Sequence, residues 1–405
     1  NFNDLKGLYS INSAYKNLTD IQTIFAKCYV NDLKTDIFFE NIIQNKKANF
    51  SRYNFFYANY LYNQNKFEQS IKLAESASAE YPRNLLINQY LKFLNKEEKN
   101  RNKFNCNNTA DIMSEILYIF ANVMSSQQDY RLSNFYLNLS KFLNPNFLSH
   151  NTLLAENMFI LKRNTEAKKI YREIEKIGSV YKWHAKKQTV SIMEIEKENN
   201  TEKFFLNAYK AIKPNIYQTF DIANFLRNKE KYPEAIRLYS EILSKINLDH
   251  ELYPKILERR GMSYERIDEW DKAEKDLINS LKLLPKEPYV MNYLAYSWIE
   301  KNMNIEKALS MLKEANKLKM SDGYITDSLG WAFYKLKNYS AAKDYLQIAI
   351  KLMPTDPVIN DHFADCLWMN NHKIQARYYW NYVLKLDSAE ESLKKKVQNK
   401  LLFGL

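Results

Sequence analysis

Small residues recur along the second half of this chain at a nearly constant interval, and that interval constrains the fold more than any other feature. The spacings are 35, 34 and 34 residues between Ala273, Ala308, Ala342 and Ala376. Gly261 and Gly330 each lie 12 residues before one of these alanines, and Pro285 and Pro354 each lie 12 residues after one. A fixed period of this length is typical of repeat proteins, in which each repeat is one small structural unit stacked on the next.

The residues that keep this phase suit two closely packed helices. Glycine or alanine lets the paired helices approach, an aromatic side chain such as Phe333 fills the gap beside it, and proline ends the second helix. Between Tyr339 and Ala349 the apolar residues follow the period of one helical face. Only six glycines and nine prolines occur in 405 residues, which are too few for a fold with many β-turns. An all-α fold is therefore predicted.

The strongest unit runs from Asp327 to Pro354 and resembles the tetratricopeptide repeat (TPR), whose period is about 34 residues. Weaker units in the same phase centre on Ala235, Ala167, Ser133 and Ser70. The resemblance implies an all-α, right-handed α-solenoid of stacked TPR helix pairs with a C-terminal capping helix. The alternative is a set of helical hairpins without true repeats, which four in-phase units disfavour.

We expect four segments along the chain. They are degenerate helical repeats at 1–110, TPR-like repeats at 111–214, well-formed TPR repeats at 215–387 and a capping helix at 388–405. The polar stretch 95–108 interrupts the phase and is predicted to be a loop or a poorly formed repeat, and a hinge. Ser388 is predicted to cap a final polar helix from Glu390 to Leu402, which would cover the apolar side of the last repeat.

Residues 215–387 also resemble TPR proteins of the Gram-negative envelope, including lipoproteins that act as adaptors for carboxyl-terminal processing proteases. The resemblance rests on Asp322-Gly323-Tyr324, on residues 327–331, on Ala364-Asp365 with Trp368, and on Ala376 with Trp380. The first 200 residues depart from that pattern. It implies an exported, lipid-anchored scaffold that delivers or assembles other proteins, in the periplasm or anchored to the outer membrane. An export signal or lipid anchor would then lie upstream of Asn1, which is not methionine.

In a TPR array the first helix of each pair lines the inner side, where a protein or peptide ligand binds. Aromatic and arginine side chains dominate such contacts, so Trp331, Tyr334 and Trp368 are the leading candidates. Packing of these rings inside the array is the alternative. The predicted groove residues are Arg227, Arg259, Arg266, Tyr296, Asp327, Trp331, Tyr334, Asp361, Asp365 and Trp368.

The chain carries no recognisable catalytic motif. Its glycines form no phosphate-binding loop, so no nucleotide cofactor is expected. His362 and Cys366 share a helical face, but further metal ligands are missing, and a buried cysteine beside a histidine is favoured. The three cysteines are odd in number and far apart, which indicates neither a disulfide framework nor a zinc site but buried small side chains. We therefore expect no catalytic residue, no metal and no cofactor.

The formal net charge of +12 leaves a second function open, an RNA-associated or ribosome-associated helical repeat. The positive charges are not visibly gathered, because lysine alternates with acidic residues everywhere except at residues 394–396. Nucleic acid is therefore the less favoured partner. No apolar run reaches the length of about 18 to 20 residues that a membrane span needs.

Overall fold

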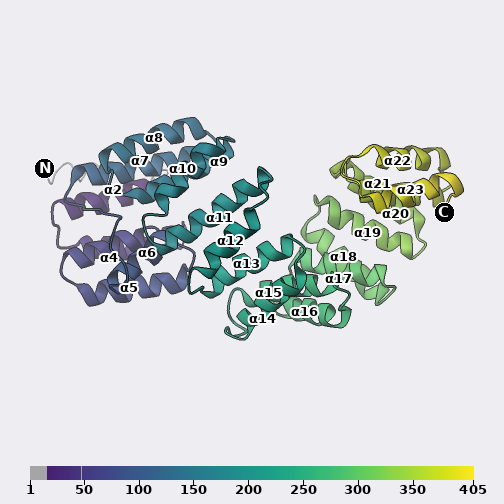
Figure 1. Cartoon of the computed structure of the whole chain (residues 1–405), viewed down its shortest axis with the longest axis horizontal. Coiled ribbons are helices and arrows are strands. Elements are labelled where there is room, and N and C mark those ends of the chain that lie inside the picture. The colour runs from purple at the N-terminus through teal and green to yellow at the C-terminus, as the bar shows by residue number, and fades with distance from the viewer. Residues whose placement is uncertain (1–15, 47) are drawn as a thin grey trace. The chain divides into compact units, whose positions relative to one another are not determined.

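The computed structural model describes residues 16–46 and 48–405, and its elements in these stretches are helices (Figure 1). The all-α prediction is confirmed. The chain divides into two compact units, an N-terminal unit that ends at Lys213 and a C-terminal unit that begins at Pro214. Each unit is a series of consecutive antiparallel helices, most of them joined by short turns.

The N-terminal unit packs its helices mainly in sequential pairs, among them α4 with α5, α7 with α8 and α9 with α10. Its helices are α2 (Lys16–Tyr29), α3 (Thr35–Gln44), α4 (Tyr53–Asn63), α5 (Phe67–Glu80), α6 (Leu85–Leu94), α7 (Thr109–Ser126), α8 (Tyr130–Leu143), the short 3-10 helix η2 (Leu148–His150), α9 (Asn151–Ile160), α10 (Asn164–Ile174), α11 (Ser179–Ile195) and α12 (Thr201–Lys210).

The C-terminal unit consists of five helix pairs followed by one more helix. The elements are α13 (Ile216–Asn228), α14 (Tyr232–Leu243), α15 (Tyr253–Glu265), α16 (Trp270–Leu283), α17 (Pro288–Glu300), α18 (Ile305–Leu318), α19 (Gly323–Lys335), α20 (Tyr339–Leu352), α21 (Pro357–Met369), α22 (Lys373–Lys385) and α23 (Glu391–Phe403). First helices of neighbouring pairs also contact one another, as α17 contacts α19 and α19 contacts α21.

The recurring small residues lie where paired helices touch, as predicted. The four alanines of the series are fully buried. A Cβ atom on Gly330 would lie 2.7 Å from Cγ of Leu346, and one on Gly261 would lie 3.0 Å from Cγ of Leu277. These distances are shorter than van der Waals contact, so a side chain at either glycine would push the two helices apart.

Serine replaces alanine at two of these contacts in the N-terminal unit. Ser70 is fully buried, and its hydroxyl donates to the carbonyl oxygen of Ala58 on the paired helix at 2.7 Å. The hydroxyl of Ser133 is equally buried and accepts from the side-chain amide of Asn157 at 2.8 Å. Each polar group is satisfied, so the small volume is kept without the cost of an unpaired hydroxyl.

The turns inside the helix pairs share a feature that the sequence did not reveal. Each has at least one non-glycine residue with a positive φ, and in the C-terminal unit one such residue per turn recurs at close to the repeat period. These residues include Glu230, Asp268, Asn302, Lys337 and Asn371. The left-handed conformation closes the first helix and reverses the chain, a position where glycine is usually favoured.

Two predictions about the loop at 95–108 are wrong. Cys28 and Cys106 form a disulfide with their Cα atoms 5.8 Å apart, whereas the sequence indicated no disulfide. The segment is a loop, as predicted, but it does not have the freedom of a hinge. Besides the disulfide, the Asn59 side-chain amide donates to the carbonyl oxygen of Phe104 at 2.9 Å, which fixes the loop to α4. Cys366 is buried and unpaired.

The predicted capping helix is present as α23 and packs on α22. Ser388 does not cap it, because the residue at the N-cap position is Glu390 and its side chain makes no capping hydrogen bond. Val397 is fully buried, whereas Leu402 and Phe403 are exposed. The helix therefore covers the last pair with one face and carries apolar side chains in solvent near its end.

Candidate functional site

The predicted groove residues all come from the first helices of the five pairs in the C-terminal unit, or from the residue that ends one of them. We call the surface of α13, α15, α17, α19 and α21 the first-helix surface. Its character changes with position along the chain: arginines lie on α13 and α15, aromatic rings on α17 and α19, and aspartates on α19 and α21. The three regions differ in how far their side chains are buried.

Arginine lines a pocket between α13, α15 and α17. The arginine pocket, as we call it, has a volume of about 260 Å³ and is lined by Arg227, Asn228, Glu230, Tyr232, Met262, Arg266 and Tyr293. Two of the predicted residues, Arg227 and Arg266, meet here. The third, Arg259, does not line the pocket, but its positive charge acts on Arg227. Burial, and then the charge of Arg259, lower the pKa of Arg227.

Trp331 is buried, so the expectation that it lies open in a groove is wrong. Only 8% of its surface is exposed, and its indole N–H donates to Glu300 at 2.7 Å. Its ring lies between two others, with centroids 4.6 Å from Tyr334 and 3.9 Å from His362, both nearly parallel to it. Trp331 therefore belongs to the core, while Tyr334 and Tyr296 remain half-buried at its edge.

The aspartates are buried as well, and their own chain occupies them. Lys400 of α23 places its ammonium group between two of them, donating to Asp361 at 2.8 Å and to Asp365 at 2.7 Å. Asp327 pairs with His362, whose Nδ1 lies 2.9 Å from Oδ2 of Asp327. The predicted exposure of all three aspartates is wrong. Lys400 of α23 covers Asp361 and Asp365, whereas Asp327 is buried against His362 of α21.

Burial, and then the neighbouring charge of Asp361, raise the pKa of Asp365 to about 6, although Lys400 acts in the opposite direction. The indole N–H of Trp380 also donates to Asp365, at 2.9 Å. Trp368 is half-buried under the end of α23. A Cβ atom on Gly404 would lie 2.5 Å from Cζ2 of its ring, so glycine is required at this close approach.

The constellation around His362 does not form a metal site. His362 turns to Asp327, while Sγ of Cys366 lies 3.5 Å from the carbonyl oxygen of Tyr339. In residues 16–46 and 48–405, no group of three or more histidine, cysteine, aspartate or glutamate side chains is arranged to hold a metal ion.

The N-terminal unit contains a buried polar network that the sequence did not indicate. Glu115 accepts two hydrogen bonds from Arg52, at 2.7 and 2.8 Å, and lies 3.1 Å from Nε2 of His150. Nδ1 of the same histidine lies 2.7 Å from the hydroxyl of Ser140. Serine, histidine and a carboxylate in this order suit acyl transfer, but a substrate would need access. Glu115 and Ser140 are fully buried, so the network is structural.

Two helices of the N-terminal unit expose an unusual amount of apolar surface. The exposed side chains of α7 are Met113, Phe120 and Val123, and those of α8 are Leu132, Phe135, Leu139 and Phe142. Phe120 and Tyr136 connect the two helices, with ring centroids 6.0 Å apart. Phe142 is 83% exposed. Large exposed apolar patches often mark interaction sites.

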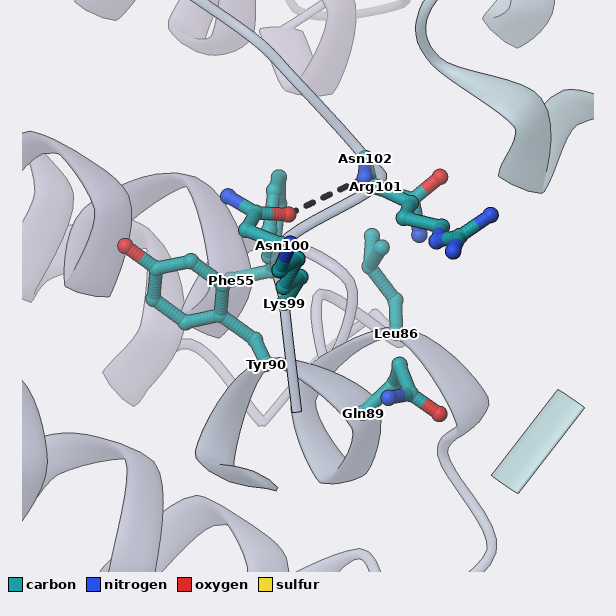
Figure 2. A pocket seen from close by; sticks show the side chains of 8 residues that line it. All are labelled: Phe55, Leu86, Gln89, Tyr90, Lys99, Asn100, Arg101 and Asn102. Atoms are coloured by element: carbon teal, nitrogen blue, oxygen red, sulfur yellow. Dashed lines mark hydrogen bonds between the residues drawn. The ribbon is translucent and has the colours of Figure 1, made fainter. Parts of the chain in front are cut away.

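A pocket of the N-terminal unit, between its loop and helices α4 and α6, is too small for a ligand. Figure 2 shows the cavity, where Lys99, Asn100 and Arg101 of the loop cross over Phe55 and Tyr90. Its volume is about 10 Å³, which is room for one water molecule at most. The side chain of Asn100 accepts from the backbone N–H of Asn102 at 3.0 Å and so shapes the loop itself.

Paired helices, close contacts at small residues and a period near 34 residues define an α-helical repeat protein. No family model matches the chain. A TPR repeat-containing protein of Pseudomonas aeruginosa is 27% identical over 136 residues, which are 34% of this chain and 22% of that protein. The matched stretch is thus less than a quarter of the relative's length. Over that stretch the chain is similar to a TPR protein, and its paired helices recur with the period of that repeat.

Solved TPR structures are similar to part of the chain. A thermophilic TPR protein of Thermus thermophilus shares 16% identity at a TM-score of 0.40, covering 47% of this chain and all of its own. A TPR protein of Parabacteroides merdae shares 17% identity at a TM-score of 0.44, covering 54% of this chain and 87% of its own.

Among the described helices, none combines the length and the apolarity needed to cross a membrane.

Proposed function

We propose that this protein is a non-catalytic scaffold or adaptor that holds a polypeptide partner on the first-helix surface of its C-terminal unit. The observation that carries the proposal is the seating of α23. A helix whose lysine enters between Asp361 and Asp365 on α21 is an example, within the chain, of a polypeptide held by this surface. Helices α13, α15 and α17 are likewise the first helices of their pairs, and a pocket remains open between them.

The proposed compartment is the bacterial envelope, where the chain would serve as an adaptor for a protease or for a multiprotein assembly. The disulfide between Cys28 and Cys106 supports an oxidising compartment, because such bonds persist mainly in exported proteins. The resemblance of residues 215–387 to envelope adaptors supports the same assignment.

Site-specific photo-cross-linking tests the proposal. A benzophenone side chain placed at Tyr289 or Tyr296 on α17 should give a discrete adduct with one protein in native cells. The matched control is the same replacement at Tyr378 on α22, which is 68% exposed but lies on a second helix. An equal set of adducts from both helices, or none from α17, would contradict binding on the first-helix surface.

A further inference from the structure

The arginine pocket contains a cation whose surroundings are unlike those of the other enclosed arginines. Nη2 of Arg227 donates to the side chain of Asn228 at 3.1 Å, and Nη1 lies 3.9 Å from Sδ of Met262. In the part of the chain that the structure describes, no carboxylate lies within ion-pair distance of Arg227. A partly buried charge is normally paired, because losing water without gaining a counter-ion costs free energy.

The arginines with structural roles show what this site lacks. Arg260, on the neighbouring helix α15, donates two hydrogen bonds to Asp276 at 2.6 and 2.9 Å. Arg52 binds Glu115 in the same two-pronged way. A guanidinium and a carboxylate match in shape, so this arrangement is the usual one for an enclosed arginine. At Arg227 the matching carboxylate is missing.

A second guanidinium and an apolar wall complete the pocket. Arg266 lines it and is 61% exposed, with its nearest carboxylate, Glu265, at 3.7 Å. That carboxylate accepts from the hydroxyl of Tyr293 at 2.8 Å. The rings of Tyr232 and Tyr293 and the thioether of Met262 supply apolar contact beside the two cations.

We propose that the arginine pocket binds a carboxylate of the partner polypeptide between Arg227 and Arg266, with an adjoining apolar group against Met262 and Tyr293. The inference rests on the proposed function, since it names one group of the ligand held there. A volume of about 260 Å³ suits a single residue rather than a larger ligand. Glu230 at the pocket and Glu265 beside Arg266 offset part of the positive charge, which favours a monoanion over a doubly charged phosphate.

The test follows the methyl group of Met262 by NMR in the full chain labelled with 13C-methyl methionine. N-acetylphenylalanine supplies a terminal carboxylate, the α-amide of N-acetylglutamate supplies a side-chain carboxylate, and N-acetylphenylalaninamide supplies none. We expect a saturable shift with at least one of the two acids and none with the amide. The acid that binds identifies the source of the carboxylate. Equal shifts with the amide, no shift up to about 50 mM acid, or tighter binding of inorganic phosphate would overturn the proposal.

Matched substitutions separate binding from structure. Arg227→Gln should weaken acid binding at least about fivefold. Arg237→Gln removes the same charge from an exposed position on α14 and should leave binding unchanged. If Arg227 had a structural role, its replacement would lower the melting temperature. Because Arg227 is unpaired and lies near the like charge of Arg259, we expect the replacement to leave the melting temperature unchanged or to raise it. Wild-type affinity in Arg227→Gln would refute the site. If acid binding fails while cross-linking at Tyr296 persists, the carboxylate inference is wrong and the proposed function is not.

Discussion

Replacing Glu115 by glutamine should strongly destabilise the N-terminal unit. Glu115 is fully buried and accepts from Arg52 at two points, and His150 lies beside it. Glutamine keeps the shape but loses the charge, so Arg52 is left enclosed without a counter-ion. Breaking a buried ion pair typically costs about 3 to 5 kcal/mol. Because the side chain of Arg52 keeps 21% of its surface exposed, we expect the lower end, about 3 kcal/mol.

Native-state amide hydrogen exchange, read by mass spectrometry, measures this loss separately in each unit. Peptides from α4 and α7 should lose about 3 kcal/mol of protection, and peptides from α19 and α20 should lose none. Two variants serve as controls. Glu97→Gln breaks an exposed pair with Lys92 and should cost less than about 0.5 kcal/mol. The double change Arg52→Met with Glu115→Leu should recover most of the loss, since apolar side chains replace a buried pair well. A loss under about 1 kcal/mol in Glu115→Gln would refute the idea that the pair is shielded from water.

Four further outcomes are expected. Burial lowers the pKa of His150 to about 4 from 6.5, so the unfolded chain binds more protons than the folded chain between these pH values. The free energy of unfolding should therefore fall by about 3 kcal/mol as the pH is lowered from 6.5 to 4, and a flat pH profile would contradict this. Lys337→Gly should raise the free energy of unfolding by about 0.5 to 1 kcal/mol, because lysine there adopts a left-handed conformation; a lower free energy of unfolding would count against it. Lys400→Met should release α23 and speed trypsin cleavage at residues 394–396, leaving Asp361 and Asp365 without their cation; unchanged cleavage would argue against that contact. Cys28 and Cys106 lie 78 residues apart, and reducing their disulfide should lower the free energy of unfolding of the N-terminal unit by about 4 kcal/mol in urea titrations. In unreduced protein from native cells, both cysteines should resist thiol alkylation.

The repeat was predictable because it depends on short-range rules. Ala342 and Gly330 must be small for two helices to touch, and that requirement recurs at a fixed distance in the sequence. The pocket at Arg227 was also within reach, since its residues lie at repeat positions. The covering of the aspartates by α23 could not be predicted, because it depends on Lys400 lying opposite Asp361, 39 residues earlier, with no periodic relation between the two. The same holds for the disulfide and for Arg52 with Glu115, which are 63 residues apart.

The buried serines at helix contacts bear on how such proteins are found. A statistical profile scores the letter at a position, whereas helix packing responds to volume and to whether each hydroxyl has a partner. Ser70 and Ser133 meet both physical conditions and would still lower a score built on alanine. The residue types of a repeat can therefore change until sequence comparison no longer detects it, while the backbone arrangement is kept. Searches that treat a hydrogen-bonded serine as equivalent to alanine should detect further repeats in segments that show no sequence similarity.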